Sequence, residues 1–266
     1  MMTLISPQSD LRADLRAPET NLDAARIRND YRLLRTALLL VGCYVFFGLL
    51  GFAVFAGFWP PPGPDMSAAE IHSYFVEHQT GLTIGMVMMA FAAPFYAPWS
   101  VAISRVISRM ESPIGGLAQI QLIGGVLTAV VTLVPATIWL TAALRADEYS
   151  AEIVQLFYHF GWTFFDTTYV CSVLQCVAIG VAILCDRRMR PLLPKWFAWC
   201  SFLTAACYVP LSLMPFFRTG PFAWNGIVSF WVVFVEFFVF TAMATFLCLH
   251  ALRRLEAEDL LAVSDR

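Results

Sequence analysis

The chain has 266 residues, of which 59% are hydrophobic and only 14% are charged, and its formal net charge at pH 7 is −2. Soluble domains carry about 45–50% apolar and about 25% charged residues. The composition therefore excludes a cytosolic globular enzyme, a secreted disulfide scaffold and a nucleic-acid-binding protein. The mean hydropathy of +0.69 favours a protein that spans a lipid bilayer.

The first 35 residues are polar and contain six arginines. We expect no cleavable signal peptide, because the first apolar run begins only near Thr36 and is too long for a signal sequence. Residues 1–35 are predicted to form a cytoplasmic tail that is partly disordered and turns helical towards the membrane. A membrane domain over residues 36–252 and a short cytoplasmic tail over residues 253–266 would follow.

Six later stretches are long enough to cross a hydrocarbon core, which needs about 20 mostly apolar residues. Their approximate ranges are 37–59, 80–104, 115–144, 155–184, 196–217 and 226–250. Helices are expected, because unpaired backbone groups are too costly in lipid, and prolines predict kinks in the second, third and fifth spans. The fold class is therefore all-α: a polytopic membrane helical bundle with six transmembrane helices.

The basic residues predict the orientation of this bundle. Cytoplasmic loops of membrane proteins are enriched in arginine and lysine. All but two of the 17 basic residues fall in the two tails and in the loops that follow the second and fourth spans, and the two exceptions are Arg145 and Arg218. We therefore expect a multi-pass protein of the bacterial inner (plasma) membrane with both termini in the cytoplasm.

The outer loops contain signals for short helices. A polyproline segment over residues 60–64 leads to Ser67 and Glu70, whose spacing is that of a capping box. A helix from there to Gln79 would lie at the outer membrane interface. A second such helix is predicted from Ser150 to Tyr158.

The motifs of several enzyme classes are missing from the sequence. It contains no nucleotide-binding glycine loop, no C-x-x-C pair and no paired histidines at metal-binding spacing. We therefore expect neither a metal nor a cofactor.

Two acidic residues fall within the predicted spans, Asp166 in the fourth and Glu236 in the sixth. An ionisable residue inside a membrane is costly and points to a function. His159 lies two helical turns from Asp166. Asp166, Glu236 and His159 are therefore the candidate catalytic residues.

Helical periodicity places polar neighbours beside each acid. Gln155 and Thr163 share a stripe with Asp166, and Asn225 and Ser229 share one with Glu236. The two stripes would face each other across an outward-opening cavity between helices four and six, with Arg145 and Arg218 at its mouth to neutralise Asp166 or to bind an anionic ligand. The candidate ligand-binding residues are Gln155, Thr163, Ser229, Asn225, Arg145 and Arg218. The same side chains fit a structural role, because polar groups also hold transmembrane helices together.

Several segments resemble a family of six-span bacterial inner-membrane proteins over about residues 33–252. They are Phe58-Trp59-Pro60-Pro61-Pro62, Ser67-Ala68-Ala69-Glu70-Ile71, the run from Pro98-Trp99 to Arg109-x-Glu111, Asp186-Arg187-Arg188 with Leu193-Pro194-Lys195-Trp196, and Thr219-Gly220-Pro221-Phe222-Ala223-Trp224-Asn225-Gly226. The last motif is the most specific. The resemblance implies a fold and a topology and implies no activity.

Three functions remain open at this point. The first is binding of, or action on, a lipophilic small molecule, with the two acids as proton donor and acceptor. The second is a non-catalytic accessory or scaffold subunit of a larger membrane complex, and the third is a proton-coupled transporter. The expected partners are the lipid bilayer, a lipophilic small molecule and either a homodimer partner, for which Gly81-x-x-x-Gly85 is a weak signal, or a larger membrane protein.

Overall fold

A computed structural model describes residues 7–112 and 114–265, and every regular element within these residues is a helix. Six helical segments are long and apolar enough to cross a membrane, which confirms the prediction of an all-α, six-span integral membrane protein. These spans are Asn21–Phe55, Gln79–Ser108, Leu117–Leu144, Ala151–Cys185, Lys195–Phe216 and Ile227–Ser264.

Several spans are built from more than one helical segment. Span one consists of α1 (Pro7–Leu39), α2 (Val41–Leu49) and the π-helix η1 (Leu50–Phe55); span two of α4 (Gln79–Ala92), the 3₁₀-helix η2 (Ala93–Phe95) and α5 (Tyr96–Ser108); span three of α6 (Leu117–Leu144). Span four consists of α7 (Ala151–Thr167) and α8 (Val170–Cys185); span five of α9 (Lys195–Tyr208) and the 3₁₀-helix η3 (Val209–Phe216); span six of the π-helix η4 (Ile227–Val232) and α10 (Val233–Ser264). The short helix α3 (Ala68–Glu77) lies between spans one and two.

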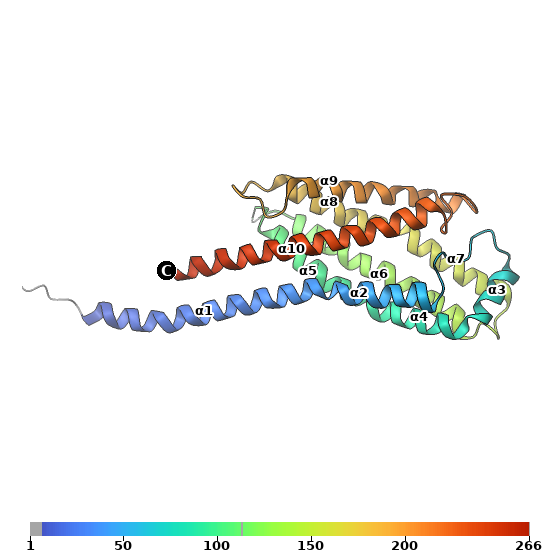
Figure 1. The fold of residues 1–266 in the computed structure, drawn as a ribbon, viewed down its shortest axis with the longest axis horizontal. Helices are drawn as coiled ribbons and strands as arrows, with labels where there is room; N and C mark the ends of the chain where they lie inside the picture. The colour runs from blue at the N-terminus through green and yellow to red at the C-terminus, as the bar shows by residue number, and fades with distance from the viewer. Residues whose placement is uncertain (1–6, 113, 266) are drawn as a thin grey trace, which may run out of the picture.

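The spans pack side by side into an elongated bundle (Figure 1). At one end, here called the terminal end, α1 and α10 run together beyond the other helices, so the start of α1 and the end of α10 lie on the same side of the bundle (Figure 1). The opposite end, here called the distal end, carries α3 and the loop that precedes η4 (Figure 1). An even number of crossings requires this placement of the termini.

Polar contacts hold the α10 extension to other elements at the terminal end. The guanidinium of Arg109 donates two hydrogen bonds to the carboxylate of Asp259, of 2.9 and 2.7 Å, and the Tyr31 hydroxyl donates a third of 2.7 Å. Ion pairs also join Arg35 to Glu256 and Arg188 to Glu258. The two segments expected to be tails are largely helical: α1 includes residues 7–35, and α10 continues to Ser264. Residues 1–6 lie outside the described part of the chain.

The loop over residues 56–67 is tied to the distal ends of spans four and six. The backbone carbonyl of Pro62 accepts hydrogen bonds from the Tyr158 hydroxyl (2.6 Å) and from the indole nitrogen of Trp224 (2.8 Å). At the end of the loop, α3 begins with a capping box between Ser67 and Glu70. The helix expected from Ser150 to Tyr158 is the first part of α7, which continues without a break into span four.

Glycines allow spans one and two to approach closely. A Cβ added to Gly85 would collide with the backbone oxygen of Gly51, and one added to Gly81 would collide with that of Phe55. A side chain at either position would therefore force the two spans apart. The Gly81-x-x-x-Gly85 face is used for packing within the chain.

Departures from α-helix occur both with and without proline. Spans two and five change to 3₁₀-helix at Pro94 and Pro210, whereas α6 continues as one α-helix through Pro135. Spans one and six contain π-helix, and span four has a turn between α7 and α8, none of which has a proline to signal it. The α-helical hydrogen-bond pattern is therefore interrupted in five spans, in the distal half or near the middle of the bundle.

Two buried cores fill the bundle. The terminal core includes Tyr44, Tyr96 and Trp99. The distal core is strongly aromatic, and its members include Phe52, Phe58, Trp139, Tyr158, Trp162, Trp224 and Phe230. The region where these two cores meet is the part of the bundle that contains the candidate site.

Candidate functional site

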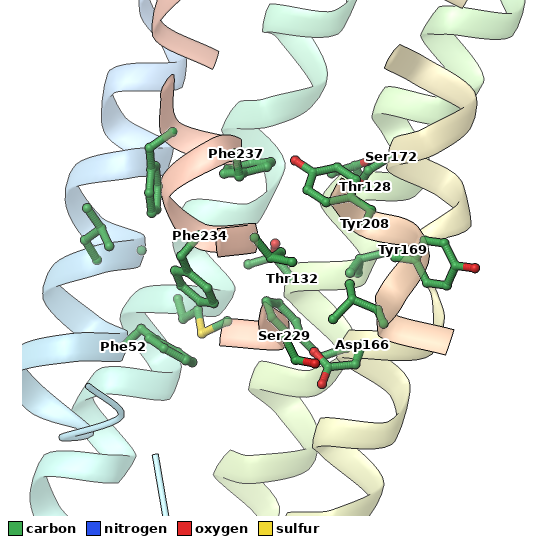
Figure 2. A pocket seen from close by; sticks show the side chains of 18 of the residues that line it. Phe52, Thr128, Thr132, Asp166, Tyr169, Ser172, Tyr208, Ser229, Phe234 and Phe237 are labelled. Atoms are coloured by element: carbon green, nitrogen blue, oxygen red, sulfur yellow. Dashed lines mark hydrogen bonds between the residues drawn. The ribbon is translucent and has the colours of Figure 1, made fainter. Parts of the chain in front are cut away.

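A cavity of about 110 Å³ lies at the meeting of the two cores (Figure 2). Its lining includes Tyr44 of the terminal core and Phe52 and Trp162 of the distal core. All six spans contribute side chains, one from each being Tyr44, Met89, Thr132, Asp166, Tyr208 and Ser229. The cavity is therefore central to the bundle, and is not confined to the space between spans four and six.

The irregular helical segments border this cavity. Phe52 belongs to the π-helix η1, Ser229 to the π-helix η4 and Leu211 to the 3₁₀-helix η3. Tyr169 lies in the turn between α7 and α8. Short π-helical segments are rare and occur frequently at functional sites, since they cost helix stability. Their position at the cavity makes it the leading candidate for a binding site.

Among the described residues that line the cavity, Asp166 is the only acidic or basic one. The residue is 4% exposed, and its Oδ2 atom is buried with no hydrogen-bond partner among the described residues. The side chain of Ser229, which carries a hydroxyl, lines the same cavity (Figure 2). That hydroxyl donates its proton to the backbone oxygen of Phe222 at 2.9 Å, so its proton is not free for Asp166. The cavity thus contains one carboxyl oxygen whose bonding capacity is unused.

Two pairs of hydroxyl groups in the lining are bonded to each other. Tyr44 and Thr132 share a hydrogen bond of 2.9 Å between their hydroxyl groups. Thr128 and Ser172 share one of 3.0 Å. These pairs join span one to span three and span three to span four. Two buried atoms of the lining have no partner among the described residues: Oδ2 of Asp166, an acceptor, and the indole nitrogen of Trp162, a donor.

Glu236, the second acid, does not line the cavity. Its carboxylate accepts a hydrogen bond from the Thr204 hydroxyl of α9, so it links span six to span five. The structure thus gives each acid a different environment. The two stripes predicted to face each other contribute one acid and one hydroxyl to the cavity, Asp166 and Ser229.

The remaining candidates on span four lie elsewhere. His159 is half-buried, with its ring centroid 5.1 Å from that of Trp224, and its Nε2 atom has no partner among the described residues. Gln155 donates a 3.1 Å hydrogen bond to the backbone oxygen of Met66. Thr163 is exposed. Of this stripe, only Asp166 reaches the cavity.

The candidates in the distal loops lie at the surface or within the loop packing. Arg145 forms an exposed ion pair with Glu148 at 3.4 Å, and Arg218 is exposed. Asn225 is half-buried, and its side chain lies next to Gly63 in the loop over residues 56–67. These three residues do not line the cavity.

The sequence reasoning missed most of the lining, which is aromatic. Nine of the 21 lining side chains are aromatic, and they include Tyr44, Phe52, Phe234 and Phe237. A spacing of four residues could have indicated part of this lining, because it places Tyr44, Gly48 and Phe52 on one face of span one. The same spacing places Thr128 and Thr132 on one face of span three. In a chain with 23 phenylalanines, such a stripe resembles ordinary lipid-facing or core packing.

Comparison with protein-family models, curated proteins and solved structures finds no match for this chain. Within the described residues, no group of three or more histidine, cysteine, aspartate or glutamate side chains is placed to hold a metal ion. The functional conclusion therefore depends on the geometry of the cavity.

Proposed function

We propose that this integral membrane protein binds a lipophilic small molecule in the cavity around Asp166. The observation that carries the proposal is the unpartnered Oδ2 atom of Asp166, which lies at a mostly apolar cavity lined by all six spans. Leaving a buried polar group without a partner costs about 1–3 kcal/mol, and more for a charged group. A bound molecule that supplies the missing partner recovers this free energy.

The composition of the lining supports the same proposal. Small-molecule sites are concave and mainly apolar, with a few polar groups that fix the orientation of the ligand. Here aromatic and aliphatic side chains surround Asp166 and Ser229. Because Glu236 is bonded to Thr204 outside the cavity, the geometry supports binding in preference to acid–base catalysis by the two acids.

We further propose that the terminal end of the bundle lies in the cytoplasm of a bacterium and that the cavity is reached from the distal, outer side. The distribution of basic residues supports the orientation, since all but Arg145 and Arg218 belong to the terminal side of the spans. The irregular segments η1, η3 and η4 form the distal ends of spans one, five and six. The α-helical hydrogen bonding is therefore less regular on the distal side. The resemblance to six-span inner-membrane proteins is consistent with the same topology.

Two glycines of α2 provide a matched test. A Cβ at Gly48 or at Gly42 meets no atom within 4 Å, so both positions have room for a side chain. Gly48 lines the cavity, whereas Gly42 is exposed and does not. A leucine at Gly48 fills the cavity, and a leucine at Gly42 adds the same bulk at the surface.

The experiment is native mass spectrometry of the protein extracted from its own membrane in mild detergent. We expect a co-purifying small molecule in the wild type and in Gly42→Leu, its loss in Gly48→Leu and a reduced amount in Asp166→Asn. Equal occupancy in Gly48→Leu and Gly42→Leu, or no bound molecule in any variant, contradicts the proposal. The same spectra detect a stoichiometric protein partner, which is the result expected for an accessory subunit.

A proton-coupled transporter is a second candidate, favoured by the position of Asp166. A protonatable group in a central cavity is where a transported proton and a substrate would compete. The irregular segments that border the cavity, in spans one, four, five and six, would allow the helices to rearrange around Asp166. Solute flux into liposomes that requires a proton gradient and is lost in Asp166→Asn is the expected result, whereas flux that persists in this variant excludes the mechanism.

A further inference from the structure

The cavity lining has an acidic group and no basic group among the described residues. Its 21 lining residues include the carboxyl group of Asp166 and no arginine, lysine or histidine. Two other acids within the spans have partners: Asp259 pairs with Arg109, and Glu236 accepts a hydrogen bond from Thr204. A buried carboxylate without a counter-charge is among the most costly groups in a membrane protein. A positive group on a ligand would supply Asp166 with both a hydrogen-bond donor and a counter-charge.

The aromatic rings of the lining also favour a positively charged ligand. Aromatic rings carry negative charge on their faces and attract cations, at about 0.5–2 kcal/mol for each contact. Rings approach the cavity from span one (Tyr44), span four (Trp162), span five (Tyr208) and span six (Phe234). The cavity thus combines a carboxyl group with aromatic rings on several sides, which is the chemistry that recognises an ammonium ion.

Most of the hydroxyl groups in the lining already form hydrogen bonds within the described chain. Tyr44 is bonded to Thr132, and Thr128 is bonded to Ser172. The Ser229 proton is donated to a backbone oxygen. The indole nitrogen of Trp162 is a second buried atom of the lining without a partner among the described residues, and it is a donor. A ligand with a single charge on an apolar body needs only the free acceptor of Asp166.

The size of the cavity limits the part of the ligand that it encloses. An engineered apolar cavity of about 150 Å³ holds one benzene molecule, and the cavity here has about 110 Å³. A compact ammonium head fits this space. The irregular segments that border it are where a longer apolar body would extend towards the distal side.

From these observations we infer that the ligand is a lipophilic cation, an amine or quaternary ammonium whose charged head lies between Asp166 and the aromatic rings. The inference rests on the proposed function, because it assigns a chemical class to the molecule bound in the same cavity. It predicts that charge, and not shape alone, determines binding.

The test compares two probes of the same shape. Benzyltrimethylammonium carries a permanent positive charge, and 2,2-dimethylpropylbenzene has carbon in place of the nitrogen. Calorimetric binding to the full-length protein in lipid nanodiscs gives the dissociation constant of each probe. We expect the cation to bind at least about tenfold more tightly to the wild type, a difference of about 1.4 kcal/mol.

Two acid variants identify the origin of the preference. Asp166→Asn keeps the shape of the side chain and removes its charge, and it is expected to abolish the preference for the cation while the neutral probe still binds. Glu236→Gln removes a charge from span six outside the cavity and is expected to leave the preference intact. Loss of the preference in both variants to the same extent contradicts a direct role of Asp166.

The outcomes separate the two proposals. If the neutral probe binds as tightly as the cation, and Gly48→Leu weakens both, the cation inference is wrong and the proposed binding function stands. If neither probe binds, or if Gly48→Leu weakens neither of them, both proposals are contradicted.

Discussion

The hydroxyl group of Tyr158, at the distal end of span four, donates a 2.6 Å hydrogen bond to the backbone carbonyl oxygen of Pro62, 96 residues earlier in the chain. Trp224 of the loop before span six donates to the same oxygen. One carbonyl group therefore joins three parts of the distal end. The loop over residues 56–67 is held over the aromatic core by this contact.

Removing the Tyr158 hydroxyl loosens this loop. In Tyr158→Phe the Pro62 carbonyl keeps Trp224 as its donor, and the lost bond is worth about 1 kcal/mol. Hydrogen exchange at the amides of Gly63, Asp65 and Met66 is expected to become about fivefold faster. Tyr149→Phe is the control, since its side chain makes no hydrogen bond in the described chain. Unchanged exchange in Tyr158→Phe contradicts this role of the contact.

The capping box of α3 predicts a pH dependence. Hydrogen bonds from the Ser67 hydroxyl and the Ser67 backbone amide hold the pKa of the exposed Glu70 below its ordinary value of 4.5. A carboxyl group with a lowered pKa stabilises the folded state above its ordinary pKa, and this contribution is lost as the pH falls through the lowered value. The first turn of α3 is therefore expected to open only when the pH falls below the ordinary pKa of a glutamate.

Nuclear magnetic resonance of the backbone amides of Ala68, Ala69 and Glu70 measures this opening. In Glu70→Gln the amide side chain cannot titrate, so the pH dependence of these signals should disappear. A dependence that persists in Glu70→Gln would show that another group is responsible.

The contact between Arg109 and Asp259 predicts the stability of the α10 extension. Hydrogen bonds to Asp259 raise the pKa of the Arg109 guanidinium above its ordinary value, so Arg109 is charged at neutral pH. The two side chains are 41% and 30% exposed, which limits the contribution to about 1 kcal/mol. Asp259→Asn should make α10 more sensitive to trypsin at Arg254.

The control for this variant is Asp30→Asn, because Asp30 is exposed on α1. If both variants are cut at the same rate as the wild type, the ion pair does not hold the extension in place.

The orientation of the bundle is tested by reporter fusions. Alkaline phosphatase is active only outside the cytoplasm, and green fluorescent protein folds in the cytoplasm. A phosphatase fused after Asp147, at the distal end, is expected to be active, and fluorescent protein fused to the carboxyl terminus is expected to fluoresce. The reverse pattern would contradict the proposed topology.

The sequence predicts the six spans because their apolar length has one physical solution. An apolar stretch such as residues 115–144 must form a helix in lipid, and it corresponds closely to α6 (Leu117–Leu144). The capping box at Ser67 is equally local, since it depends on two residues three positions apart. Structural features that depend on residues close together in the chain can therefore be predicted from the sequence.

The cavity could not be predicted in this way, because it depends on how spans that are distant in the sequence pack against one another. The periodicity of span four puts Asp166 and Thr163 on nearby faces, yet the structure buries Asp166 and leaves Thr163 exposed. The π-helices η1 and η4 have no sequence signal, and each rotates the residues that follow it relative to an α-helix. Such rotations help to determine that Ser229 lines the cavity and Glu236 does not.

An experimental density map of the protein in lipid nanodiscs, purified without added ligand, tests the central claim most directly. The account predicts density that belongs to no protein atom within hydrogen-bond distance of the Asp166 carboxyl group, enclosed by side chains of all six spans. A map in which a side chain of the chain itself pairs with Asp166, and in which no space remains around it, would contradict the account.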